Sequence, residues 1–95
     1  MYKVIFKPRA ERIFGKLDRK IQQQIVIEVE KLAQDPFSKS NVKKISGTEY
    51  GYRLRVSRWR ILYSLQADKR LIEVIDLFME KSKKDYTIRK RLFVF

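Results

Sequence analysis

The chain contains no cysteine and no histidine. Without cysteine it cannot form a disulfide, present a thiolate nucleophile or bind zinc through sulfur. Without histidine it lacks the commonest general acid/base and the commonest metal ligand of proteins. Any catalysis must therefore use Lys, Arg, Tyr, Asp, Glu, Ser or Thr, and we expect neither a metal ion nor another cofactor.

Long hydrophobic runs are also missing. No apolar stretch approaches the ~18 residues that a membrane-spanning helix requires, and residues 1–8 lack the apolar core and cleavage site of a signal peptide. We therefore expect a cytoplasmic protein. The length of 95 residues, 44% of them hydrophobic, suits a single domain over residues 1–95 with one modest core.

Acidic residues are scarce, because 11 Asp and Glu stand against 23 Lys and Arg, which gives a formal net charge of +12. The excess is concentrated in residues 43–60 and 81–91, which hold 12 of the cations but only two acids, Glu49 and Asp85. A surface charged only for solubility would intersperse the two signs. The pattern indicates a polyanionic partner, either nucleic acid, an acidic protein or an anionic membrane surface.

Two helices are predicted in the first third of the chain. Apolar residues recur at helical spacing in 10–17 and again in 21–32. Pro8 suits the first position of the first helix, and Asp18 can cap the second. The second helix should end at Asp35, because a residue that precedes proline avoids the helical region. The two helices should form a hairpin.

Four strands are predicted from alternating or continuously apolar runs at 2–6, 52–56, 59–65 and 71–78. Residues 36–51 are typical of a long loop, and residues 83–92 favour a short terminal helix. The expected fold class is α+β, with the helical hairpin packed on one face of a mostly antiparallel four-stranded sheet in the order β-αα-βββ.

The strands at 52–56 and 59–65 predict a cluster of arginines. If Ser57 and Arg58 form a two-residue turn, the apolar residues of both strands share one face. Arg55 then lies directly opposite Arg60, with Arg53 on the same face. Opposed like charges destabilise a sheet. Such charges can protect an edge strand from aggregation, but three guanidinium groups also outline a pocket for a phosphodiester, which they bind through paired hydrogen bonds.

The sequence around these arginines resembles the signature of the RelE/ParE toxin superfamily. The segments VKKISG at 42–47 and YRLRVSRWRILY at 52–63 are similar to that family's block K-L-x-G followed by Y-R-(L/I)-R-V-x-x-(Y/W)-R-(V/I)-(I/L)-Y. The resemblance extends over nearly the whole chain. It implies the toxin of a type II toxin–antitoxin system and, in the RelE branch, a ribosome-dependent endoribonuclease that cleaves mRNA.

The resemblance also implies roles for particular residues. Ungapped comparison with the family places Glu80 where a catalytic arginine is expected, so the basic residue of that position has to come from the lysines that follow. The implied catalytic residues are Arg53, Arg55, Arg60, Lys81 and Tyr86. Further cations of the two basic segments are expected to bind RNA, namely Lys43, Lys44, Arg58, Lys83 and Lys84.

The reaction that the resemblance implies is attack of an RNA 2′-OH on the adjacent phosphate, which needs no metal. The three arginines would stabilise the charge that develops on phosphorus-bound oxygens. Arginine is a poor proton carrier, with a pKa above ~12. Proton transfer therefore falls to a lysine of 81–84 or to Tyr86, whose pKa the crowded cations should lower. The cleavage rate should then keep rising above pH 7.

Two alternatives remain open from the sequence. One is a non-catalytic toxin that binds DNA gyrase, as in the ParE branch. The other is a basic RNA-binding module, such as a ribosome-associated protein. For the toxin we expect the ribosome and mRNA as targets, no membrane partner, and a heteromeric complex with a cognate acidic antitoxin that folds on the basic surface.

Overall fold

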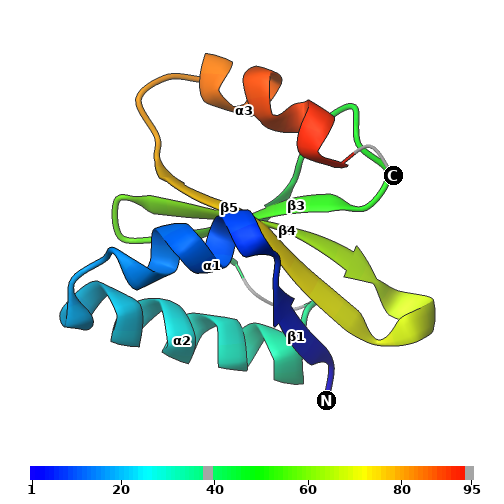
Figure 1. The fold of residues 1–95 in the computed structure, drawn as a ribbon. Coiled ribbons are helices and arrows are strands. Elements are labelled where there is room, and N and C mark those ends of the chain that lie inside the picture. The colour runs from blue at the N-terminus through cyan, green and yellow to red at the C-terminus, as the bar shows by residue number, and fades with distance from the viewer. Residues whose placement is uncertain (38–39, 94–95) are drawn as a thin grey trace.

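The computed structural model describes residues 1–37 and 40–93 (Figure 1). The described chain is an α+β fold, as predicted. Its elements are, in order, β1 (Lys3–Phe6), α1 (Pro8–Gly15), α2 (Arg19–Gln34), β2 (Val42–Lys44), β3 (Gly51–Val56), β4 (Trp59–Gln66), β5 (Leu71–Met79) and α3 (Lys84–Arg89). Single turns of 3₁₀ helix follow β4 and α3, at Ala67–Lys69 and Lys90–Phe93.

The helix ends lie where the sequence predicts them. Pro8 begins α1, where its missing N–H costs nothing. The Asp18 side chain accepts a hydrogen bond of 3.0 Å from the backbone N–H of Ile21 and so caps α2. The second helix ends at Gln34, directly before the Asp35–Pro36 pair. Local chemistry therefore determines the hairpin of α1 and α2.

The sheet has five strands in the order β1-β5-β4-β3-β2. Strand β1 runs parallel to β5, and the other neighbours are antiparallel. The fifth strand, β2, lies within the range expected to be a loop. It pairs with β3 through Val42 opposite Leu54 and Lys43 opposite Arg53. A strand of three residues is too short for alternation to be visible in the sequence.

The sheet is covered on both faces (Figure 1). The helical hairpin packs on one face, where Ile25, Val29 and Leu32 of α2 meet the buried apolar residues of β3, β4 and β5. On the other face, Phe93 and the partly buried Tyr86 pack on Leu62 and Phe78. The face that carries the arginines is thus not open over its whole width, because the C-terminal segment covers part of it.

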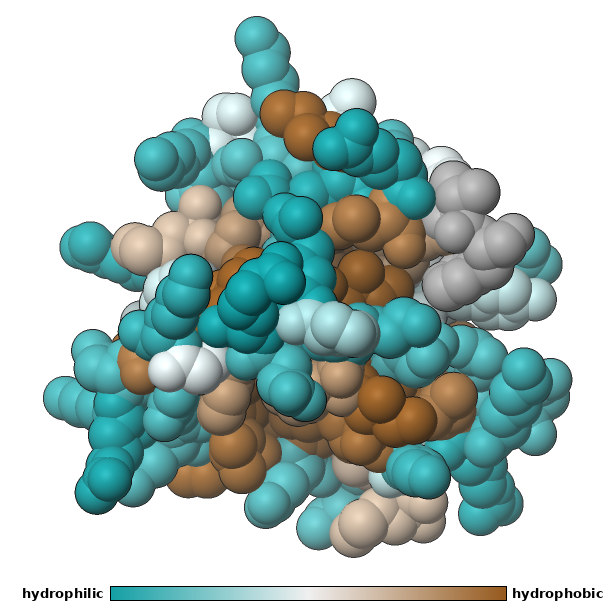
Figure 2. Space-filling model, in the orientation of Figure 1, coloured by the Kyte–Doolittle hydropathy of each residue, from teal (hydrophilic) through white to brown (hydrophobic). Residues whose placement is uncertain are grey.

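Apolar side chains also reach the surface. Figure 2 shows them gathered around β1 and the neighbouring part of α2, while polar side chains dominate over α3. Val26 and Ile27 on α2 are 41% and 50% exposed. No helix among residues 1–37 and 40–93 has the length and apolar character needed to cross a membrane.

Candidate active site

The pairing of β3 with β4 places the three arginines together. Arg55 lies opposite Arg60, and Arg53 lies opposite Leu62 on the same face. Ser57 adopts a left-handed backbone conformation, with φ of 57°, in the two-residue turn. The predicted register is therefore confirmed. The apolar partners on the opposite face hold this register, since a shift by one residue would bury the arginines.

The three arginines line a hollow of about 300 Å³. Lys43 of the edge strand β2 adds a fourth cation, and Glu80, directly after β5, contributes one carboxylate. Ser40 and Asn41 complete the lining. Four cations around one carboxylate leave an excess of positive charge, so the hollow is suited to an anion.

Arg60 is the most constrained of these cations, with its side chain only 14% exposed. Its Nη1 donates to the backbone oxygens of Ser57 and Trp59, at 3.2 and 3.1 Å. Its buried Nε has no hydrogen-bond partner among the described residues, and lies 3.6 Å from Glu80 Oε1. Glu80 thus faces this buried N–H as an ion pair, and the two backbone contacts hold the guanidinium in a fixed position.

Arg53 connects the hollow to the C-terminal helix. Its Nη1 donates to the phenolic oxygen of Tyr86 at 2.8 Å and to Glu80 Oε1 at 3.3 Å. The guanidinium carbon lies 4.9 Å from the centre of the Tyr86 ring. The structure thus brings Tyr86 beside the arginines, as the resemblance implied, and adds Glu80 to the same cluster.

The pKa of Tyr86 lies above its ordinary value. Burial contributes most, and the hydrogen bond with Glu80 raises the pKa further, while Arg53 acts in the opposite direction without compensating. The expectation that crowded cations lower the pKa of Tyr86 is therefore wrong. At neutral pH the phenol is protonated, so it can donate a proton but cannot accept one.

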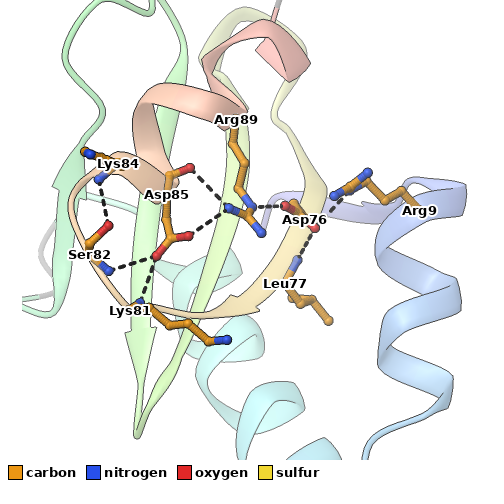
Figure 3. A network of polar contacts seen from close by, with 8 residues as sticks. All are labelled: Arg9, Asp76, Leu77, Lys81, Ser82, Lys84, Asp85 and Arg89. Carbon is orange, nitrogen blue, oxygen red and sulfur yellow. Dashed lines mark hydrogen bonds and ion pairs between the residues drawn. The ribbon is translucent and has the colours of Figure 1, made fainter.

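A buried carboxylate holds α3 on the sheet (Figure 3). Asp76 of β5 is fully buried and accepts from Nε of Arg89 on α3 at 2.6 Å and from Nε of Arg9 on α1 at 3.0 Å. It also accepts from the backbone N–H of Leu77 at 2.9 Å. The Arg89 guanidinium carbon lies 3.9 Å from the ring centre of Phe78. This network fixes the helix that carries Tyr86.

This role of Asp76, and that of its partner Arg89, were not predicted from the sequence. The sequence signal for this role was the position of Asp76 within the mostly apolar run of the central strand β5. A carboxylate buried there must be paired with a cation or hydrogen-bonded. The sequence alone could not show that one partner comes from α1 and the other from α3.

The remaining predicted residues divide into two groups. Lys43, Lys44 and Lys83 line a second hollow of about 260 Å³, which adjoins the first through Arg53 and also contacts Tyr86. Lys44 Nζ donates to the backbone oxygen of Glu49 at 2.7 Å. Within the described part of the chain, three predicted residues line neither of these hollows, namely Arg58, Lys81 and Lys84.

Because the chain has no His or Cys, a metal ion would have to be bound by Asp and Glu side chains. The described residues contain no group of three or more Asp and Glu side chains placed to hold a metal ion.

The fold and the arginine cluster together can be compared with known protein families. The chain matches the family described as "ParE toxin of type II toxin-antitoxin system, parDE" over residues 4–82, and it belongs to this family. It is thus a toxin of a type II toxin–antitoxin system within the RelE/ParE superfamily. No curated protein sequence matches it significantly.

Solved structures show the same fold. The isolated E. coli RelE toxin is 23% identical, with a TM-score of 0.74 over 97% of this chain and 99% of that chain. The toxin of the intact E. coli RelBE complex is 24% identical, with a TM-score of 0.73 over 86% of this chain and 100% of that chain. The archaeal RelE–RelB complex from Pyrococcus horikoshii is 21% identical, with a TM-score of 0.71 over 80% of this chain and 91% of that chain.

Proposed function

We propose that this toxin is an endoribonuclease that cleaves mRNA on the ribosome. The observation that carries the proposal is the convergence of Arg53, Arg55 and Arg60 on one hollow. Such a site matches the scissile phosphate of RNA. The 2′-OH of the substrate supplies the nucleophile, and no metal is required.

The arginines stabilise the phosphorane formed during attack. The backbone oxygens of Ser57 and Trp59 hold the Arg60 guanidinium in place before substrate binds. Preorganised donors of this kind act on charge that develops only in the transition state. Tyr86, protonated at neutral pH, donates a proton to the departing 5′ oxygen. Lys81 lines neither hollow, so we assign it no step.

The ribosome orders the substrate in this proposal. The cations of the two adjoining hollows recognise phosphate groups, which carry no sequence information. In-line attack by a 2′-OH requires a strained backbone geometry, and holding reactants in such a geometry contributes much of the rate. A ribosome that positions mRNA supplies this order, and Lys43, Lys44 and Lys83 then contact the flanking phosphates.

Mapping of RNA 5′ ends tests the proposed function. Adding the toxin to a translating extract should produce new 5′-hydroxyl ends at fixed positions within codons, and none on the same mRNA without ribosomes. Blocked DNA supercoiling with intact mRNA would instead support the gyrase-binding function of the ParE branch, whose name the matched family carries. If the toxin neither cleaves mRNA nor blocks supercoiling, the result would support a basic RNA-binding module.

We further propose that an acidic antitoxin covers the arginine hollow. Two of the three similar structures described above are toxin–antitoxin complexes. A disordered acidic segment can fold over a large basic surface, and opposite charges make the association fast and sensitive to salt.

Co-expression with the neighbouring reading frame should yield a stable complex and restore growth. The association rate should fall by about tenfold or more as salt rises. Arg55→Glu should weaken the complex, whereas Arg12→Glu on the exposed side of α1 should not. Toxicity that no acidic neighbour relieves would contradict this partner.

A further inference from the structure

Glu80 is the carboxylate at the centre of the arginine cluster. It lies directly after β5, at the end of the strand that brings Asp76 into the molecule's interior. Its Oε1 lies 3.3 Å from Nη1 of Arg53 and 3.6 Å from Nε of Arg60. Its side chain remains 28% exposed, so a substrate in the hollow can reach it.

The proposed cleavage still lacks a residue that acts as the general base. Cleavage by a 2′-OH needs a group that takes the proton of that hydroxyl. The cations that face Glu80 across the hollow, Lys43, Arg53, Arg55 and Arg60, are donors. Burial and the contact with Glu80 raise the pKa of Tyr86, so its phenol is a proton donor in this site.

The hollow can hold Glu80 and a phosphate together. Its lining carries four cations and the single carboxylate. A phosphodiester adds one negative charge, so the occupied hollow still has more positive than negative groups. Substrate binding therefore does not require Glu80 to leave or to be neutralised.

We propose that Glu80 is the general base of this ribonuclease. The assignment depends on the proposed RNA cleavage. The Glu80 carboxylate removes the proton from the 2′-OH as O2′ bonds to phosphorus. The bond between phosphorus and the 5′ oxygen breaks, and that oxygen takes the proton of Tyr86. The products are a 2′,3′-cyclic phosphate and a 5′-hydroxyl.

The contact between Tyr86 and Glu80 closes the proton cycle. After cleavage Glu80 carries the proton from the 2′-OH, and Tyr86 has lost its own. The two groups lie side by side, since Glu80 Oε1 and the Tyr86 hydroxyl both accept from Nη1 of Arg53, at 3.3 and 2.8 Å. One transfer from the carboxylic acid to the tyrosinate restores both groups for the next turnover, with no net change in protons.

The test is single-turnover cleavage of mRNA on programmed ribosomes by the wild-type protein and Glu80→Gln. The amide keeps the size of the side chain and can still accept a hydrogen bond from Arg53. We expect a rate constant lower by about 10²–10⁴-fold. Affinity for ribosomes carrying mRNA with a 2′-O-methyl group at the cut site should be unchanged or higher, because the variant gains positive charge.

The pH dependence separates a base from a structural carboxylate. The wild-type rate should stay level from about pH 6 to 9, whereas a tyrosine or lysine base, with an ordinary pKa of about 10, would make it rise. The rate of Glu80→Gln should instead rise about tenfold per pH unit, because hydroxide replaces the missing base. The level wild-type profile expected here takes the place of the rising profile that the sequence predicted for a tyrosine or lysine base.

Controls distinguish the possible failures. Glu11→Gln, an exposed carboxylate on α1, should cleave at the wild-type rate. Formate should raise the rate of Glu80→Ala, whose vacant position admits a small carboxylate. If Glu80→Gln cleaves within about threefold of wild type or keeps its level profile, Glu80 is not the base. If the wild-type protein does not cleave mRNA, the ribonuclease function fails and the base assignment fails with it.

Discussion

Arg60→Ala should lower the rate of mRNA cleavage by about 10²–10³-fold, because it removes a preorganised donor to the phosphorane. Growth inhibition by the expressed toxin should disappear with it. The variant should remain folded. It loses two hydrogen bonds to the backbone of the β3–β4 turn, each worth about 1 kcal/mol, and the ion pair with Glu80, which keeps Arg53 as a partner, but it also loses the repulsion from Arg55.

Arg58→Ala provides the matched control. Arg58 lies in the same turn, is exposed, and lines neither basic hollow of the described chain. Its loss lowers the net charge by the same amount, so the two variants differ in position alone. Equal loss of activity in both would attribute the effect to overall charge. Unfolding of Arg60→Ala, seen by circular dichroism, would show that Arg60 is required for folding rather than for binding phosphate.

Asp76→Asn should lower the free energy of unfolding by about 3 kcal/mol, because it leaves two guanidinium groups without their buried counter-charge. For a domain of this size, that corresponds to a melting temperature lower by about 10–20 °C. The reason lies in the position of Asp76, which is fully buried and joins α1 and α3 to β5. Thermal and urea unfolding measure both quantities.

The same substitution should release α3 before the rest of the chain unfolds. Trypsin should then cut more rapidly after Lys83 and Lys84, since α3 loses its attachment through Arg89. Asp68→Asn, an exposed acid between β4 and β5, is the control and should leave the melting temperature within about 2 °C of wild type. A similarly small change in Asp76→Asn would contradict the role of the buried carboxylate.

The sequence alone was sufficient for the hairpin of α1 and α2 and for the arginine cluster. Both depend on local periodicity. The capping oxygen of Asp18 and the restriction before Pro36 act within a few residues. The face that Arg55 and Arg60 share follows from the alternation of side chains on either side of a two-residue turn.

Only the tertiary structure decided what surrounds those arginines. Arg53 meets Glu80 and Tyr86 across 27 and 33 residues of sequence, and Asp76 meets Arg9 across 67. Local patterns carry no information about such contacts, because they depend on how α3 packs on the sheet. Burial and the contact with Glu80 also determine the protonation of Tyr86, where the sequence showed only neighbouring cations. Local sequence thus places the arginines proposed to bind phosphate, and long-range packing determines which groups lie beside them.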